Sequence, residues 1–421
     1  MITWWMRKRM TLISAVILMG CAFIVRAQTA EKIETLDARQ WDFTNRFPLK
    51  GNWSYIENKL VSPKAMNPRD FNTMTFPSLW NDYRADGKGT GCATYALNVL
   101  LPDTVTMLAL EIPQLYSSYN VWVDGQHIIS AGVPACDKEN SEPRWVYQTV
   151  SFKAKGDTLR IMLQLANFHH HKGGGKNPIY LGTVNSINSH FNWSIGSNAV
   201  EAFILFAEGI FFLFFYKRIQ KPVVLYFALI CITWSIRSVF SNIYPVALMF
   251  PQFSWAWLVR IEYITLYLTV IWAALFFSAL FKETSNRIFV YLPIGLNIFF
   301  VLFTLLTPAT IYTRWVSLYL IVAVLVILYG VILIVRALVN DEQGSWFLMI
   351  SIWVGVLIFG YDIAAYQSSF PYNIVLLNIG YVTIFILTTV ALLFHLGIFK
   401  SKIAENSVLT INDLYGKGKK L

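Results

Sequence analysis

Residues 199–241 read AVEAFILFAEGIFFLFFYKRIQKPVVLYFALICITWSIRSVFS, which is two long apolar runs joined by the basic segment KRIQK. Each run approaches the ~20 residues with which an α-helix crosses the hydrocarbon core of a bilayer. Comparable runs continue almost to the end of the chain. They occupy about 199–216, 222–241, 255–281, 288–307, 315–335, 345–366 and 374–399. The sequence therefore predicts a membrane domain of seven α-helices over 197–400.

The overall composition agrees with a chain that is partly embedded in lipid. Of its 421 residues, 56% are hydrophobic and 14% are charged, whereas soluble domains carry roughly 25% charged residues. The net charge is +10, but the Lys and Arg residues are scattered and many flank apolar runs, as orientation signals do. We therefore expect the membrane bilayer as a partner and no nucleic acid.

Basic residues are distributed unevenly among the loops that join the apolar runs. The loops after the first, third and fifth runs contain Lys or Arg, and those after the second, fourth and sixth contain none before Arg314. Cytoplasmic loops are enriched in Lys and Arg. The bias predicts that the amino-terminal half lies outside the cytoplasm and that the tail, 401–421, lies inside it, in a bacterial inner membrane.

The amino terminus resembles an export signal. A basic cluster around Lys8 precedes an apolar stretch over 12–25, and small residues lead to Ala27. This pattern predicts a signal peptide over 1–27 with cleavage after Ala27. Lipoprotein processing at Cys21 is an alternative, although Met19 is atypical of such a site and apolar residues continue beyond the cysteine.

Between 28 and 190 the pattern changes to short alternating or β-branched runs separated by Gly, Pro, Asn and Asp. These runs fall at 96–101, 106–112, 118–123, 148–152 and 158–165. Strands at this spacing indicate an antiparallel sandwich. Asp124 and Gly125 follow one run directly and predict a tight hairpin, because Gly readily adopts a positive φ.

Several short motifs resemble those of a known family. In the exported half they are LKGNWSY at 49–55, FPSLW at 76–80, GTGCATY at 89–95, VWVDG at 121–125 and NFHHHKGG at 167–174. In the helical half they are WSIR at 234–237, RIEY at 260–263 and YDI at 361–363. In this order, over about 45–400, they resemble the bacterial seven-transmembrane receptors with diverse intracellular signalling modules, the 7TMR-DISM family. The resemblance implies a jelly-roll sandwich, similar to galactose-binding domains, ahead of seven helices.

Members of that family usually carry a cytoplasmic output domain after the helices. Here about twenty residues follow Phe399, fewer than the ~40 that a packed domain needs. We therefore expect the signal to pass to a cytoplasmic partner on another chain.

Ionisable residues within the predicted helices are costly in hydrocarbon unless they are paired or face water. By the predicted topology several lie near the outer ends, where they could form a charged cluster beneath the exported domain. The candidates for coupling a signal across the membrane are Arg237, Arg260, Glu262 and Asp362. Snorkelling to the interface and static pairing between helices are the alternative roles.

The exported domain offers candidates for a ligand site. Sugars stack on aromatic rings and bond to flanking polar groups, and loops at the rim of a sandwich commonly carry recognition. The candidates are Arg144, Trp145, Asn167, His169, His170 and Lys172. The expected ligand is small, with carbohydrate as one possibility, although inward aromatic residues of a sandwich usually belong to its core. Adjacent histidines on a strand point to opposite faces, so we predict no metal site and no cofactor.

Two cysteines, Cys92 and Cys136, lie in the exported part beyond the predicted signal peptide. They could pair, because an exported compartment can be oxidising. Two buried free thiols are the alternative, and the sequence separation gives no geometry that decides between them.

The sequence shows no motif of a zinc protease, an α/β-hydrolase or a P-loop enzyme, and we predict that the chain is not an enzyme. The favoured function is a membrane receptor that senses an extracytoplasmic ligand and relays it through seven helices. Two alternatives stay open. One is a transporter or channel with an accessory exported domain, and the other is an anchor protein that binds envelope polymers.

Overall fold

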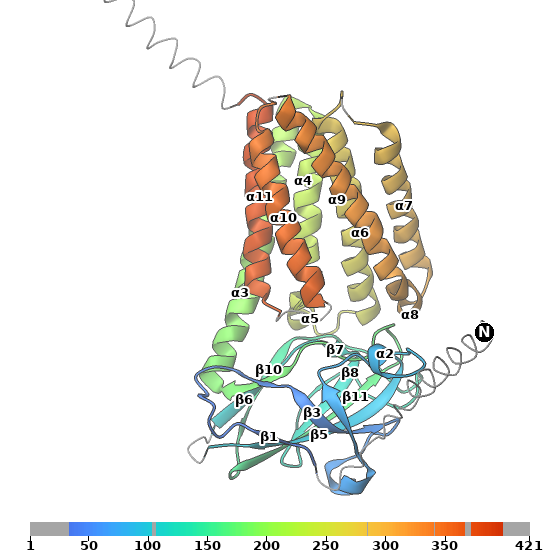
Figure 1. Ribbon diagram of the computed structural model, residues 1–421, viewed down its shortest axis with the longest axis vertical. Helices are drawn as coiled ribbons and strands as arrows, with labels where there is room; N and C mark the ends of the chain where they lie inside the picture. Colours follow the sequence, from blue (N-terminus) through green and yellow to red (C-terminus); the bar gives the residue numbers. More distant parts are fainter. Residues whose placement is uncertain (1–32, 103–106, 284, 341, 367–371, 399–421) are drawn as a thin grey trace, which may run out of the picture.

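The computed structural model describes residues 33–102, 107–283, 285–340, 342–366 and 372–398. A β-sandwich forms the amino-terminal part, and a bundle of long helices stands on it (Figure 1). The predicted signal peptide, 1–27, and the predicted tail, 401–421, lie outside the described residues.

The sandwich consists of two main sheets and a short strand pair. The seven-stranded sheet follows the order β4 (Asn72–Phe76), β3 (Gly51–Glu57), β5 (Gly91–Leu100), β11 (Thr158–Asn167), β8 (Ser118–Val123) and β9 (Gln126–Ala131), with β1 (Thr35–Asp37) parallel to β5. The four-stranded sheet follows β10 (Gln148–Lys153), β6 (Met107–Ile112), β13 (Ile179–Thr183) and β2 (Phe47–Leu49). The short pair is β12 (Gly174–Gly175) with β7 (Leu115–Tyr116). Short helical turns are η1 (Pro63–Ala65), η2 (Pro68–Asp70) and α2 (Trp80–Tyr83).

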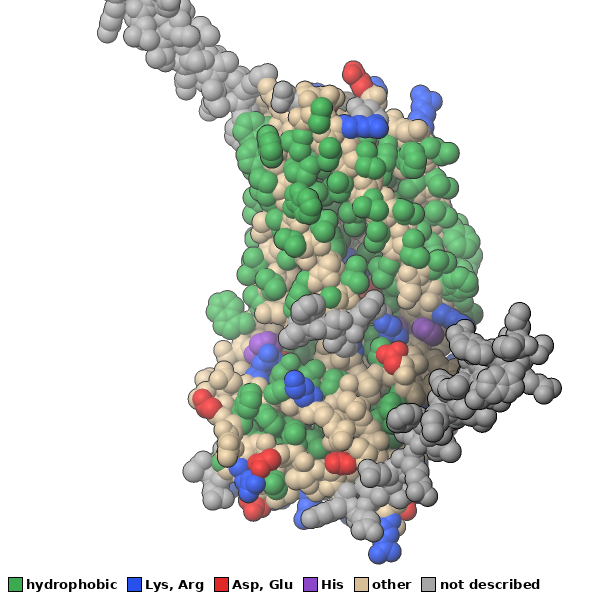
Figure 2. Space-filling model, viewed as in Figure 1, with side chains coloured by type: hydrophobic (Ala, Val, Ile, Leu, Met, Phe, Trp, Pro, Cys, Tyr) green, Lys and Arg blue, Asp and Glu red, His purple; other side chains and the backbone are tan. Residues whose placement is uncertain are grey.

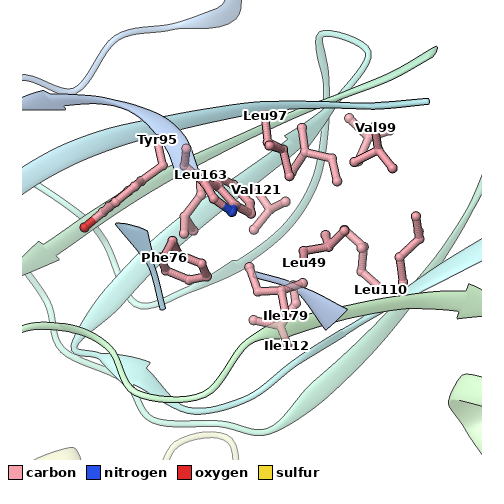
Figure 3. Close-up of a cluster of buried hydrophobic side chains, with 14 of the residues drawn as sticks. Leu49, Phe76, Tyr95, Leu97, Val99, Leu110, Ile112, Val121, Leu163 and Ile179 are labelled. Carbon is pink, nitrogen blue, oxygen red and sulfur yellow. The ribbon is translucent and has the colours of Figure 1, made fainter. Parts of the chain in front are cut away.

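The core of the sandwich lies between the two sheets (Figure 3). Leu97, Val99 and Leu163 come from the larger sheet, and Leu110 and Ile179 come from the smaller one. Each of these side chains is at most 1% exposed. Because alternate residues of a strand face the same side, each strand supplies every second residue to this core. The predicted all-β sandwich is confirmed.

The structure of the sandwich tests the predicted hairpin and the predicted alternatives for its two cysteines. β8 and β9 join at Asp124 and Gly125, whose φ angles are +48° and +77°, so the predicted hairpin is confirmed. Cys92 of β5 forms a disulfide with Cys136, and their Cα atoms are 5.0 Å apart, a separation typical of bridged residues.

Seven long apolar helices follow, and they confirm the seven predicted spans within the described residues. They are α3 (Val184–Ile219), α4 (Pro222–Phe240), α6 (Trp255–Leu280), α7 (Arg287–Leu306), α9 (Val316–Val339), α10 (Ser345–Tyr366) and α11 (Ile374–His395). The short elements α5 (Pro245–Met249), α8 (Ala309–Tyr312) and η3 (Thr313–Trp315) lie at the sandwich end of the bundle. Hydrophobic side chains cover the flank of the bundle, whereas charged side chains gather on the sandwich and at the opposite end (Figure 2).

The first long helix connects the two parts without a loop. α3 begins directly after β13, and the Thr183 side chain caps it by accepting a 3.1 Å hydrogen bond from the Ser186 backbone N–H. The predicted domain boundary at 190 therefore falls inside the helix. With 36 residues, α3 is about 54 Å long at 1.5 Å per residue, which exceeds the ~30 Å hydrocarbon core. Its first turns can thus stand outside the bilayer and carry the sandwich.

Gly209 of α3 faces α4 at close range. A β-carbon added there would lie 2.6 Å from Cγ1 of Ile232 and 3.2 Å from the carbonyl oxygen of Ala228. Small residues at such positions let membrane helices approach one another. Gly209 therefore sets the spacing between α3 and α4.

Gly209→Leu should force α3 and α4 apart and lower the free energy of unfolding by about 1–3 kcal/mol, the usual cost of overpacking. Thermal unfolding of the purified protein in detergent measures this change. Gly196→Leu in the same helix is the control, because a β-carbon at Gly196 meets nothing within 4 Å. Equal destabilisation by the two substitutions would contradict the tight contact.

Candidate functional site

Aromatic rings pack between the sandwich and the ends of the helices that face it. Trp145, in the loop before β10, is 3% exposed. Its ring centroid lies 5.5 Å from that of Tyr116 in the sandwich, 5.3 Å from that of Tyr244 before α5, and 5.5 Å from that of Trp255 at the start of α6. Trp145, a sequence candidate for ligand binding, therefore packs against both domains.

The segment over 167–175 also contacts the helices. The Asn167 side-chain amide is buried and donates to the carbonyl oxygens of Gly89, His170 and Lys172 at 2.8–2.9 Å, which fixes the shape of this segment. The backbone N–H of His171 donates to Oγ1 of Thr313 in η3 at 3.2 Å. The predicted rim loop is thus seated on the bundle.

The basic ligand-site candidates of the sandwich occupy different surroundings. His170 stacks on Tyr116 at 4.8 Å between ring centroids, and burial lowers the pKa of His170 to about 3, so this imidazole is neutral. Burial also lowers the pKa of Lys172 to about 7. Arg144 is half-buried, and its backbone N–H donates to the carbonyl oxygen of Ser117 at 2.9 Å. Among the described residues no three His, Cys, Asp or Glu side chains converge as a metal site requires.

A cavity of about 640 Å³ lies between the sandwich and the bundle. Its sandwich wall includes Arg46, Glu111, Trp145, Tyr147, Lys176 and Tyr180, with His190 from the first turns of α3. Its bundle wall includes Arg237, Tyr244, Glu262, Tyr263, Asp362 and Tyr372. The structure thus brings together Arg237, Glu262 and Asp362 of the four predicted coupling residues. Arg260 does not line this cavity.

Glu111 organises the sandwich wall. Its Oε1 accepts hydrogen bonds from Arg46 Nη1 at 2.7 Å and from the Tyr147 hydroxyl at 2.5 Å, and it lies 3.2 Å from His190 Nδ1. Burial alone would raise the pKa of Glu111, but the His190 hydrogen bond and the Arg46 charge outweigh burial and lower it. Oε2 is buried and has no hydrogen-bond partner among the described residues. Glu111 was not among the site residues predicted from the sequence, although an acid within the apolar strand MLALEI was a usable signal.

The bundle wall holds opposite charges that do not pair directly. Arg237 Nη1 donates to the backbone carbonyl of Glu262 at 2.6 Å, whereas the Glu262 carboxylate accepts from the Tyr244 hydroxyl at 3.3 Å. Asp362 accepts from the Tyr381 hydroxyl at 3.4 Å. Within the described residues no ion pair of 4.0 Å or less joins Arg237 to either carboxylate.

Lys176, from the segment between β12 and β13, brings a sandwich cation to these carboxylates. Burial lowers the pKa of Lys176 to about 8, and the negative charges of Asp362 and Glu262 oppose that effect. Its Nζ lies 5.7 Å from the ring centroid of Tyr372. The cavity therefore contains charges of both signs from both domains, arranged around a space that can hold a small molecule.

Comparisons with known proteins concern each half separately. Residues 202–398 match the model of the family described as 7TM diverse intracellular signalling. No curated protein matches the chain.

Solved glycosidase structures share a partial likeness with the chain. A β-galacturonidase from Eisenbergiella tayi aligns at 13% identity and a TM-score of 0.25, covering 33% of this chain and 24% of the enzyme. A Faecalibacterium prausnitzii β-glucuronidase aligns at 14% identity and a TM-score of 0.26, covering 32% of this chain and 31% of the enzyme. A glycosyl hydrolase family 2 member from Bacteroides cellulosilyticus aligns at 10% identity and a TM-score of 0.27, covering 33% of this chain and 20% of that protein. This chain thus spans between about a fifth and a third of their lengths.

The family match comes from the helical half of the chain. Its seven long apolar helices and its family match cover the same part of the chain. This chain is a multi-pass membrane protein, and its helical half, residues 202–398, matches the 7TM diverse intracellular signalling family.

Proposed function

We propose that this protein is a non-enzymatic receptor of the bacterial inner membrane. It binds a small extracytoplasmic ligand in the cavity between the sandwich and the helices, and it relays binding to a cytoplasmic partner on another chain. The observation that carries the proposal is the shared wall of the cavity, because Glu111 and Lys176 come from the sandwich while Arg237 and Asp362 come from the bundle. A ligand that binds one arrangement of the two domains more tightly shifts the equilibrium toward it.

The proposed orientation rests on the basic residues of the loops. Lys217 and Arg218 end α3, and Arg336 lies in the last turn of α9. Basic side chains gather at the end of the bundle opposite the sandwich (Figure 2). Since cytoplasmic loops are enriched in Lys and Arg, this end faces the cytoplasm in our proposal, and residues 28–190 contain the exported sensor.

The chemistry of the wall supports a carbohydrate as the ligand. Trp145, Tyr147 and Tyr372 offer aromatic rings on which the apolar face of a sugar can stack. Arg237 and Lys176 supply donors, and the carboxylates opposite them supply acceptors for hydroxyl groups. Because charges of both signs are already present in the wall, a neutral polyhydroxyl ligand adds no uncompensated charge to the buried space.

A screen of the full-length protein against mono- and oligosaccharides should find a sugar that raises Tm. At a concentration one hundred times Kd the stabilisation is about 2.7 kcal/mol. Asp362→Asn should abolish or strongly reduce the shift. Glu208→Gln is the matched control, because Glu208 is another carboxyl of the bundle that bonds to Thr389 and lies outside the cavity. A shift that survives in Asp362→Asn, or no shift with any sugar, would count against this ligand site.

Coupling can be separated from binding by distances at the cytoplasmic end. Spin labels at Lys282 and Arg336, both exposed, should report a changed distance distribution when the sugar saturates the wild-type protein. Arg237→Ala should remove this change even at saturation, because Arg237 touches the α6 backbone at Glu262. An identical response in Arg237→Ala would show that the signal does not pass through this arginine.

A further inference from the structure

A second cavity, of about 380 Å³, lies between the sandwich loops and the outer ends of α6 and α8. Lys138 and His169 line it from the sandwich, and Arg260 and Tyr312 line it from the helices. No Asp or Glu among the described residues lines it, whereas the first cavity contains three carboxylates. The second cavity is therefore basic.

The amino terminus of α6 opens onto this cavity, which Ser254 and Trp255 also line. Ser254 precedes the helix and makes no side-chain capping hydrogen bond. The first N–H groups of a helix have no intrahelical partner and carry a positive partial charge. In a helix of 26 residues this end favours a bound oxyanion.

Three residues that line this cavity carry buried polar atoms without a hydrogen-bond partner among the described residues. Tyr312 is 1% exposed, yet its hydroxyl has no hydrogen-bond partner among the described residues. Trp255 Nε1 and His169 Nδ1 are also buried without partners in that part of the chain. Buried polar atoms are rarely left unpaired in proteins. A ligand with acceptor oxygens would satisfy the Tyr312 and Trp255 donors together.

Arg260 supplies a cation in the first turns of α6. Its Nε donates to the carbonyl oxygen of Thr304 at 3.3 Å, and its guanidinium carbon lies 5.5 Å from the ring centroid of Trp257. No carboxylate of the described residues pairs with it within 4.0 Å. Guanidinium groups bind phosphate oxygens in a bidentate manner.

The position of the cavity relative to the membrane surface indicates the source of the oxyanion. Trp257, in the first turn of α6, is 51% exposed, and Phe253 just before the helix is 37% exposed. Exposed aromatic rings at the end of a membrane helix lie at the level of the lipid headgroups. We propose that this cavity binds a phosphate group, that of a phospholipid headgroup in the outer leaflet, between Lys138, Arg260 and the amino terminus of α6. The site is separate from the ligand cavity and goes beyond the proposed receptor function.

Native mass spectrometry of the full-length protein in detergent tests this site with three probes: dioleoylphosphatidylglycerol, dioleoylglycerol and inorganic phosphate. The phosphatidylglycerol should bind and the phosphate-free dioleoylglycerol should not. Lys138→Ala with Arg260→Ala should weaken binding about tenfold or more, as expected for lost hydrogen bonds between charged groups. The control is Lys153→Ala with Arg160→Ala, which removes the same charge from exposed positions of β10 and β11.

Lys138 is exposed, so Lys138→Glu alone tests the site without disturbing the helices and should also weaken binding. Selective binding of phosphatidylglycerol supports the lipid source, and binding of inorganic phosphate that these variants lose supports a soluble phosphate in the same cavity. Absence of binding by both phosphate probes, equal binding of dioleoylglycerol, or unchanged binding in the Lys138 and Arg260 variants would overturn the proposal.

Discussion

Trp145 is buried at a place where the sandwich alone could not bury it. Its ring packs against Tyr244 and Trp255 of the helical half as well as against Tyr116 of the sandwich. Burying an aromatic side chain removes about 150–250 Å² from water, and the part of this area that the helices cover favours contact between the domains by about 25 cal/mol per Å². The contact therefore favours a seated sandwich, and both cavities exist because the two domains meet there. α3 supports this arrangement, since it leaves β13 without a loop.

The polar groups around Trp145 explain why the interface is not simply apolar. Glu111 is 2% exposed and is stabilised by Arg46, Tyr147 and His190. A buried carboxylate is costly unless it is paired and hydrogen-bonded, and two partners from the sandwich and one from α3 stabilise this acid at the wall of the cavity. The bundle holds its charges apart instead of pairing them. Charged groups that are not paired with one another remain able to form hydrogen bonds with a ligand.

Hydropathy and turn chemistry predicted most of the fold. The seven helices, the sandwich and the Asp124–Gly125 hairpin were predictable because each can be recognised from residues that are close together in the sequence. The sites depend on contacts between distant residues. Arg46 and Glu111 are 65 positions apart, so their pairing left no local signal. Nothing in the sequence showed that the segment over 167–175 would sit on η3 instead of forming an open rim.

The separation of the predicted charged cluster has a simple geometric cause. Arg260 and Glu262 are two residues apart on α6, and such positions point to nearly opposite sides of a helix. One therefore lines the basic cavity while the other lines the mixed one. Arg237 and Asp362 come from other helices that face the same space as Glu262.

A short cross-link can test whether the sandwich is seated on the helices. The backbone nitrogen of His171 lies 3.2 Å from the Thr313 hydroxyl. In membranes that contain full-length protein with His171→Cys and Thr313→Cys, a thiol cross-linker of about 5 Å should join the two positions rapidly and in high yield. A pair with Lys153→Cys in place of His171→Cys should remain unlinked. Failure of the first pair to cross-link, while both thiols react with a small maleimide, would show that the sandwich is not seated on the helices at this contact.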